Sequence, residues 1–165
     1  MATVTVRPVR REEAGLVLDL VRGLAEYEKL AHEVEASEEG LAAALFGEAP
    51  RVFCDIAETD GAAAGFALWF YTFSTFRGKH GIYLEDLFVR PEHRGLGIGK
   101  ALLAGLARRC VEEDLGRLEW AVLDWNEPAI AFYRSMGARL LDGWTICRVD
   151  GAELLALGGQ KTQII

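Results

Sequence analysis

The stretch that decides the fold runs from Val89 to Leu103 and reads VRPEHRGLGIGKALL. It predicts the end of a strand, a glycine-rich loop and an amphipathic helix. Three glycines within five residues let the backbone turn tightly and approach a ligand closely. A helix that begins directly after them points its unpaired N–H groups at that ligand, and its dipole attracts phosphate. With added positive charge at Arg94 and Lys100, residues 94–100 are predicted to bind a pyrophosphate.

Two common nucleotide-binding loops do not fit this stretch. A Walker-type loop requires Ser or Thr after Gly-Lys, whereas Ala101 follows Lys100, and Arg94 stands where that loop needs its first glycine. A dinucleotide-binding loop needs G-x-G-x-x-G, one residue longer than the G-x-G-x-G found here. The remaining pattern, Arg-x-x-Gly-x-Gly, resembles the acetyl-CoA loop of the GNAT N-acetyltransferases. The resemblance implies acetyl-CoA as co-substrate; the alternative is a glycine-rich turn that only caps the helix.

Composition favours one compact domain. The 165 residues are 51% hydrophobic, and no linker or repeat interrupts them, so we expect a single domain over 1–165 with its core at about 3–157 and a loose C-terminal tail. No apolar run approaches the ~20 residues of a membrane span, and the N-terminus lacks the pattern of a signal peptide, so we expect a cytoplasmic protein with no membrane partner. A net charge of −7 argues against nucleic acid and is compatible with a small cationic substrate. The cysteines and histidines lack metal-ligand spacing, so no metal site is predicted.

Local patterns predict alternating strands and helices, read from apolar periodicity, turn residues and helix caps such as Ser37. The expected strands are 2–8, 51–59, 62–74, 82–89, 117–123 and 144–149; the expected helices are 11–31, 37–46, 97–113 and 127–136, with a last helical turn at 152–157. This order predicts an α/β fold with a mixed, mostly antiparallel sheet flanked by helices. It also matches the GNAT fold, and that resemblance implies that strands 82–89 and 117–123 splay apart.

The chemistry of acetyl transfer to an amine requires a base, because an aliphatic amine has a pKa near 10 and holding it unprotonated at pH 7 costs about 4 kcal/mol. Glu85 is the leading base candidate, since it interrupts an apolar strand and should be partly desolvated, which raises its pKa. The alternatives are a structural ion pair or a solvated position. Asp86 is expected on the opposite face of the strand as a supporting hydrogen-bond acceptor.

The leaving thiolate calls for an acid, and Tyr133 is the leading candidate. It lies in WNEPAIAFYRSMG, residues 125–137, which resembles the GNAT segment in which an Asn begins a helix and an aromatic–Tyr pair precedes a glycine. The resemblance implies that this tyrosine points at the CoA sulfur and that Asn126 holds the cofactor. The alternative is that Tyr133 belongs only to the helix core.

A narrower resemblance extends from about residue 3 to residue 157. The motifs LAEYE (24–28), YLEDLFV (83–89), RGLGIG (94–99) and WNEPAIAFY (125–133) are similar to the diamine (spermidine/spermine) N-acetyltransferase family, which has a thialysine-preferring branch. The resemblance implies a homodimer and an amine channel lined by Tyr27 and Glu28, with Asp142 before Gly-Trp as a further substrate contact. Asp142 replaces the family's glutamate and the loop before it is shorter, so the length of the accepted amine stays open. The alternative functions are acetyl transfer to amines of proteins or antibiotics, and binding of acyl-CoA by a non-catalytic sensor domain.

The predicted site therefore has three parts. The catalytic residues are Glu85 and Tyr133; the cofactor-binding residues are Leu87, Phe88, Val89, Arg94, Gly95, Leu96, Gly97, Ile98, Gly99, Lys100, Asn126, Pro128, Ala129 and Tyr133; and the substrate-binding residues are Tyr27, Glu28, Glu85, Asp142 and Trp144.

Overall fold

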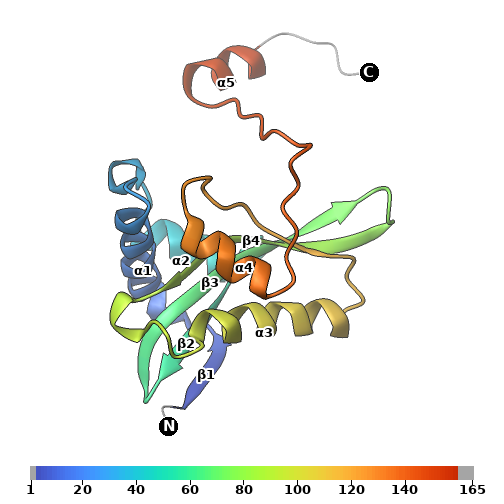
Figure 1. Ribbon diagram of the computed structural model, residues 1–165. Helices are drawn as coiled ribbons and strands as arrows, with labels where there is room; N and C mark the ends of the chain where they lie inside the picture. Colours follow the sequence, from blue (N-terminus) through green and yellow to red (C-terminus); the bar gives the residue numbers. More distant parts are fainter. Residues whose placement is uncertain (1–2, 160–165) are drawn as a thin grey trace. The chain divides into compact units, whose positions relative to one another are not determined.

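The computed structural model describes residues 3–159, which form two compact units, one up to Trp125 and one from Asn126 onward. The first unit contains one five-stranded sheet in the order β1-β2-β3-β4-β5 (Figure 1). Its strands are β1 (Val4–Pro8), β2 (Phe53–Thr59), β3 (Ala62–Ser74), β4 (Lys79–Val89) and β5 (Leu118–Glu119). The first four pair antiparallel and β5 pairs parallel to β4. The predicted α/β class with a mixed, mostly antiparallel sheet is confirmed.

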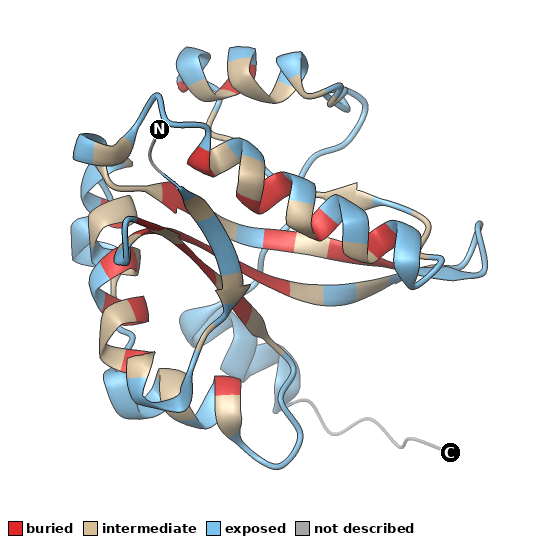
Figure 2. Cartoon of the chain, turned by 90° about the horizontal axis from the view of Figure 1, so that it is seen from below, coloured by how far each residue is buried: buried red, intermediate tan, exposed pale blue. Residues whose placement is uncertain are grey.

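Helices cover both faces of this sheet. They are α1 (Ala14–Tyr27), α2 (Glu38–Phe46) and α3 (Ile98–Glu112), with short 3-10 turns at 11–13, 31–33 and 91–93. Figures 1 and 2 show α3 across one face, with α1 and α2 against the other. Ser37 caps α2 as predicted, because its Oγ accepts the N–H of Gly40 at 3.1 Å.

The expected helix over 11–31 is wrong in its extent, since α1 ends at Tyr27. Lys29 adopts a left-handed conformation with φ of 63°, which no continuing helix can contain. Its N–H donates to Glu26 O and the next N–H, of Leu30, donates to Ala25 O at 2.8 Å. This pair of bonds is a Schellman cap, which satisfies the last carbonyls of the helix and turns the chain away.

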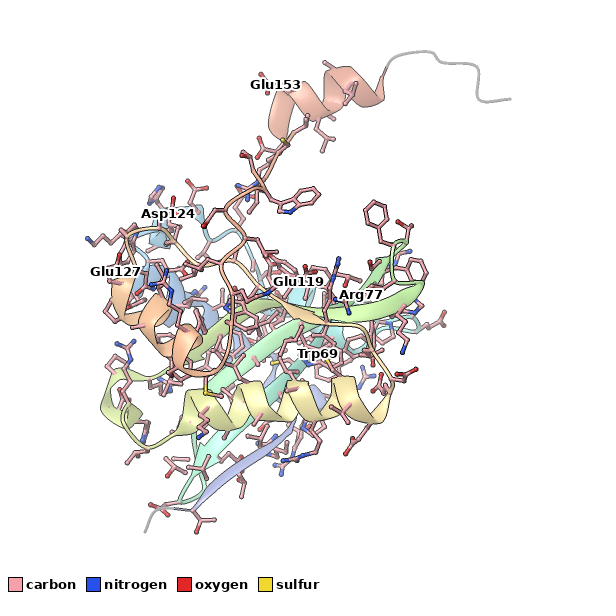
Figure 3. All side chains as sticks on the ribbon, turned by 45° about the vertical axis from the view of Figure 1, so that its right-hand side comes forward. Trp69, Arg77, Glu119, Asp124, Glu127 and Glu153 are labelled. Carbon is pink, nitrogen blue, oxygen red and sulfur yellow. The ribbon has the colours of Figure 1, made fainter. Side chains whose placement is uncertain are left out.

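The core between α1 and the sheet is built by alternating strand residues. Val17 and Leu20 of α1 pack with Ile56, Phe66 and Phe88 of three neighbouring strands. The other face of the strands contacts α3, and Figure 3 shows Trp69 on the side of the sheet that α3 covers. The guanidinium carbon of Arg109, from α3, lies 5.0 Å from the centroid of the Trp69 ring. Figure 2 shows the buried positions on the sides of the helices that face the strands. Each strand thus alternates between an α1 face and an α3 face.

The two central strands separate as expected. β5 is shorter than the predicted 117–123 and pairs with β4 only at Ile82↔Leu118 and Tyr83↔Glu119, while β4 continues to Val89. The N–H of Arg90 donates to Ala64 O of β3, so by strand alternation the backbone groups of Leu87 and Val89 point to the side that β5 has left. Splaying thereby exposes backbone donors and acceptors at the end of β4.

The second unit contains α4 (Glu127–Ser135) and α5 (Gly151–Gly158). The predicted strand at 144–149 is wrong, because residues 138–141 and 144–150 have no regular structure. A strand needs a neighbour for its backbone hydrogen bonds, and residues 126–159 contain no second strand to supply one. The last helix extends beyond the predicted turn at 152–157. The expected loose tail falls largely on residues 160–165, outside the described residues, and the single domain over 1–165 stays a prediction.

Candidate active site

The glycine loop, residues 94–100, has the conformation that its sequence predicts. Gly95 and Gly97 have φ of 81° and 79°, in the left-handed region, and no atom lies within 4 Å of a Cβ built on either. Gly97 is the N-cap of α3 and offers no side-chain cap. The first N–H bonded inside the helix is that of Ala101, which donates to Gly97 O at 2.9 Å. The preceding N–H groups of the first turn therefore remain for an anion, and a pyrophosphate fits this open helix start.

Arg94 connects this loop to β4 and to α1. Its Nε donates to Val89 O at 3.1 Å, and its guanidinium lies 4.8 Å from the ring centroid of Tyr27 and 6.0 Å from that of Phe88. The carbonyl of Val89 is thus already bonded within the protein. Arg94 consequently fixes the start of the glycine loop against a residue of the predicted amine channel.

Glu85 occupies a special position in β4. The register passes from Leu68↔Asp86 to Trp69↔Leu84, so Glu85 is the extra residue of a β-bulge. The bulge breaks the alternation from which Asp86 was assigned to the face opposite Glu85. Asp86 shares the α1 face with its partner Leu68, whereas Leu84 shares the α3 face with Trp69.

The carboxylate cluster consists of Glu28, Glu85 and Asp86. Burial, followed by the charges of Glu85 and Glu28, raises the pKa of Asp86 to about 6. Burial also raises the pKa of Glu28. Within residues 3–125, no Lys or Arg forms an ion pair with any of the three. The expectation of a partly desolvated Glu85 is wrong, because its side chain is exposed and Asp86 is the half-buried carboxylate.

The cluster comes together because α1 lies close to β4. A Cβ at Gly23 would lie 2.8 Å from Cε1 of Phe88, so only glycine permits this approach of helix and strand. Tyr27 and Glu28, at the end of α1, are thereby carried to the α1 face of β4 near Asp86. The structure also brings Tyr27 next to Arg94, whereas the amine channel itself stays a prediction.

The second unit holds the remaining predicted residues. Asn126 caps α4, its Oδ1 accepting the N–H of Ala129 at 3.4 Å, and Pro128 lies in the first turn; the predicted helix start is confirmed. Tyr133 lies on α4, its ring centroid 5.4 Å from that of Phe132. The exposed residues Asp142 and Trp144 follow in the irregular segment.

Sequence reasoning undervalued Asp86 and did not assign Trp125 to the site. The ring of Trp125 lies 6.3 Å from that of Tyr27, centroid to centroid. The signal for Asp86 was available in part, since two adjacent acidic residues in an apolar strand suggest a break in alternation. No pattern in the sequence pairs Trp125 with Tyr27.

A cavity of about 470 Å³ lies elsewhere, between β1 and α3. Its lining is Val4, Val6, Arg7, Pro8, Asp55, Ala101, Gly105, Arg108, Arg109 and Glu112, and it contains none of the predicted site residues. We therefore place the active-site candidate at the glycine loop and the carboxylate cluster. In residues 3–159, no group of three or more His, Cys, Asp or Glu side chains is placed to hold a metal ion, and no helix there has the length and apolarity to cross a membrane.

An anion-binding helix start beside splayed strands and acidic side chains is an arrangement suited to acyl transfer from a pyrophosphate-bearing donor to an amine. The model of the acetyltransferase (GNAT) family matches residues 18–138 of this chain, and the chain belongs to that family. The fold is accordingly the GNAT fold.

Similar proteins indicate which kind of acetyltransferase this chain resembles. The chain is 39% identical to the thialysine N-epsilon-acetyltransferase of Bos taurus, over 97% of this chain and 100% of that protein. It is 31% identical to the spermidine/spermine N(1)-acetyltransferase-like protein 1 of Homo sapiens, over 93% of this chain and 24% of that protein. Among solved structures, the integron cassette protein VCH_CASS6 from the mobile metagenome of V. cholerae superposes with a TM-score of 0.79 at 28% identity, over 95% of this chain and 98% of that one. The chain is an N-acetyltransferase.

Proposed function

We propose that this protein transfers the acetyl group of acetyl-CoA to a primary amine of a small diamine, polyamine or thialysine-like substrate. The observation that carries the proposal is the carboxylate cluster. Burying like charges without a counter-ion is costly, and such an arrangement is favoured where a cationic ligand completes it. The names of the two relatives, a thialysine and a spermidine/spermine-like acetyltransferase, support the same substrate class.

The glycine loop is proposed to hold acetyl-CoA, whose chemistry is to present an acyl group on a good leaving thiolate. The N–H groups at the start of α3 take the pyrophosphate, and Lys100 adds a positive charge. The backbone groups of Leu87 and the N–H of Val89, which β5 leaves open, pair with the pantetheine amides. The helix start at Asn126, Pro128 and Ala129 is proposed to contact the same molecule.

Two residues are proposed to carry out separate proton transfers. Glu85 accepts the amine proton through water, and the freed nitrogen forms its bond to the acyl carbon in a ternary complex. As the carbon–sulfur bond breaks, the hydroxyl of Tyr133 gives its proton to the sulfur. The nitrogen, cationic after its attack, then loses its second proton, which restores the hydroxyl of Tyr133 by way of water. Asp86 is a second candidate for the base, because a pKa of about 6 suits a group that must be ionised near neutral pH.

The deciding experiment is thiol release from acetyl-CoA with a panel of amines. We expect saturable turnover with at least one of 1,5-diaminopentane, spermidine or thialysine. Turnover confined to a peptide N-terminus or an aminoglycoside would move the enzyme to another substrate class. Binding of acetyl-CoA without turnover on any amine would instead support a sensor.

The role of Tyr133 is tested by Tyr133→Phe. Loss of a general acid lowers kcat by about 100-fold or more, while acetyl-CoA still binds. The matched control is Phe132→Leu on the same helix, which should leave the pH profile intact. An unchanged kcat in Tyr133→Phe would remove this residue from the acid role.

A homodimer and a cytoplasmic location are further parts of the proposal and rest on the resemblance to the diamine acetyltransferases. Sedimentation equilibrium measures the first, with twice the mass of the 18.2 kDa chain expected. A monomer at micromolar concentration would refute it.

A further inference from the structure

The segment that follows α1 places a lysine on an aromatic face of the site. The ammonium of Lys29 lies 5.3 Å from the ring centroid of Trp125, within the range of a cation–π interaction. Trp125 is half exposed, and its ring is tilted against that of Tyr27 at 6.3 Å between centroids. The two aromatic rings lie at the end of α1, where the half-buried Glu28 directly follows Tyr27.

The backbone at Lys29 is unusual for a lysine. It occupies the left-handed position of the Schellman cap, where glycine or asparagine is ordinarily found, and a Cβ there costs roughly 1 kcal/mol. A residue that is strained in this way keeps its side chain at a cost to stability. Such strain points to a function for the side chain.

The two cations on these rings are held differently. Arg94, over Tyr27, is anchored because its Nε donates to Val89 O at 3.1 Å. Within residues 3–125, the ammonium of Lys29 has no salt bridge, and its stem is flexible. The cation over Trp125 is thus the exchangeable one.

We infer that the face of Trp125 is a binding subsite for the second, non-reacting ammonium of the substrate, and that Lys29 is an internal cation which this ammonium displaces. The inference rests on the proposed function and deepens it by selecting amines with two positive charges. The ammonium that reacts is drawn toward Asp86 and Glu28, while the distant one lies on the indole. Lys29 then keeps the aromatic face covered until a dication arrives and weakens the binding of substrates by competition.

The test compares 1,5-diaminopentane with 1-aminopentane, two amines of the same length that differ in the second charge. In Trp125→Leu, the ratio of kcat/KM for the diamine to that for the monoamine should fall about three- to tenfold, the value of one cation–π contact. Trp125→Phe, which keeps an aromatic face, should restore part of that ratio. A ratio equal to that of the unaltered enzyme in Trp125→Leu would overturn the subsite.

Lys29→Asn provides the second measurement, because asparagine tolerates the left-handed backbone and carries no charge. The KM for the diamine should fall about threefold, with no comparable fall for the monoamine. Lys29→Arg keeps a cation and should leave the KM high. An unchanged KM in Lys29→Asn would overturn the competition. Failure of the unaltered enzyme to acetylate any amine would instead refute the proposed function, so the two failures are distinguishable.

Discussion

The glycine loop and the carboxylate cluster lie on one unit and are built on opposite principles. The glycine loop works through backbone: Gly95 and Gly97 at positive φ and the free N–H groups of α3, none of which titrates. The carboxylate cluster works through side chains whose charge depends on burial and on one another. Sequence spacing suffices to place the first kind of site, whereas the second needs elements distant in the chain to meet. The two should also respond to different perturbations.

Of these two regions, the carboxylate cluster is expected to show the larger effect. Asp86→Asn removes a charge that we propose attracts the cationic substrate. A hydrogen bond to a charged group contributes about 1.5–3 kcal/mol, so kcat/KM for the amine should fall about tenfold or more at pH 8. The rise of kcat/KM with pH near 6 should disappear as well, since Asp86 has a pKa of about 6. The KM for acetyl-CoA is expected to stay constant. Glu85→Gln is the matched control: if the limb near pH 6 vanishes there and persists in Asp86→Asn, Glu85 is the base and Asp86 only binds.

A substitution in the glycine loop should have a smaller effect, and it should change the KM for acetyl-CoA rather than the kinetics with the amine. Gly97→Ala puts a Cβ at φ of 79°, a strain of about 1–2 kcal/mol, and should raise the KM for acetyl-CoA about five- to tenfold at every pH. Gly61→Ala is the matched control, because Gly61 has φ of 80° in the turn between β2 and β3 and open space around it. Both variants should lose similar stability in thermal melts, but only Gly97→Ala should affect acetyl-CoA. An equal rise of KM in both would mean that strain alone is being measured.

The smallest effect concerns stability. The pKa of Asp86 in the folded protein is about 6, above the usual 3.8, so the folded state holds this proton more tightly than the unfolded state. The protonated carboxyl of Asp86 therefore stabilises the folded state below about pH 4, and this stabilisation is lost as the pH rises to about 6. At pH 8, the free energy of unfolding of Asp86→Asn is therefore expected to exceed that of the unaltered protein by roughly 1–2 kcal/mol, and its melting temperature to be higher. At pH 4 the two proteins should differ little. Equal melting temperatures at pH 8 would contradict the burial of this charge.

Stability and activity should thus move in opposite directions at Asp86. A residue that raises catalytic efficiency while lowering the free energy of unfolding is characteristic of an active site. The glycine loop differs, because its strained positions carry glycine and so cost little in the native sequence.

Much of the first unit could be predicted because its signals are local. Ser37 caps α2, Gly97 begins α3, and the strands around the turn at Gly61 follow the expected boundaries within a few residues. Asn126 begins α4 as its motif indicates. Caps and tight turns depend on one residue's own conformational energy and its nearest hydrogen bonds, so a short stretch of sequence determines them.

Predictions failed where the outcome depended on a distant partner. The alternating residues 144–149 predict a strand, but no strand of the second unit pairs with them. The faces of Glu85 and Asp86 follow from alternation until the bulge in β4 shifts the register by one residue. Burial then falls on Asp86, and with it the raised pKa.

By itself, the sequence determined the class of fold, the conformation of the glycine loop and the family, because spacing and residue type act over a few consecutive positions. The tertiary structure decided which carboxylate is buried, where α1 stops and which ring receives the ammonium of Lys29. The physical reason is that desolvation and cation–π attraction exist only between groups that folding brings within a few ångströms. A periodic pattern in the sequence cannot predict which distant groups come that close.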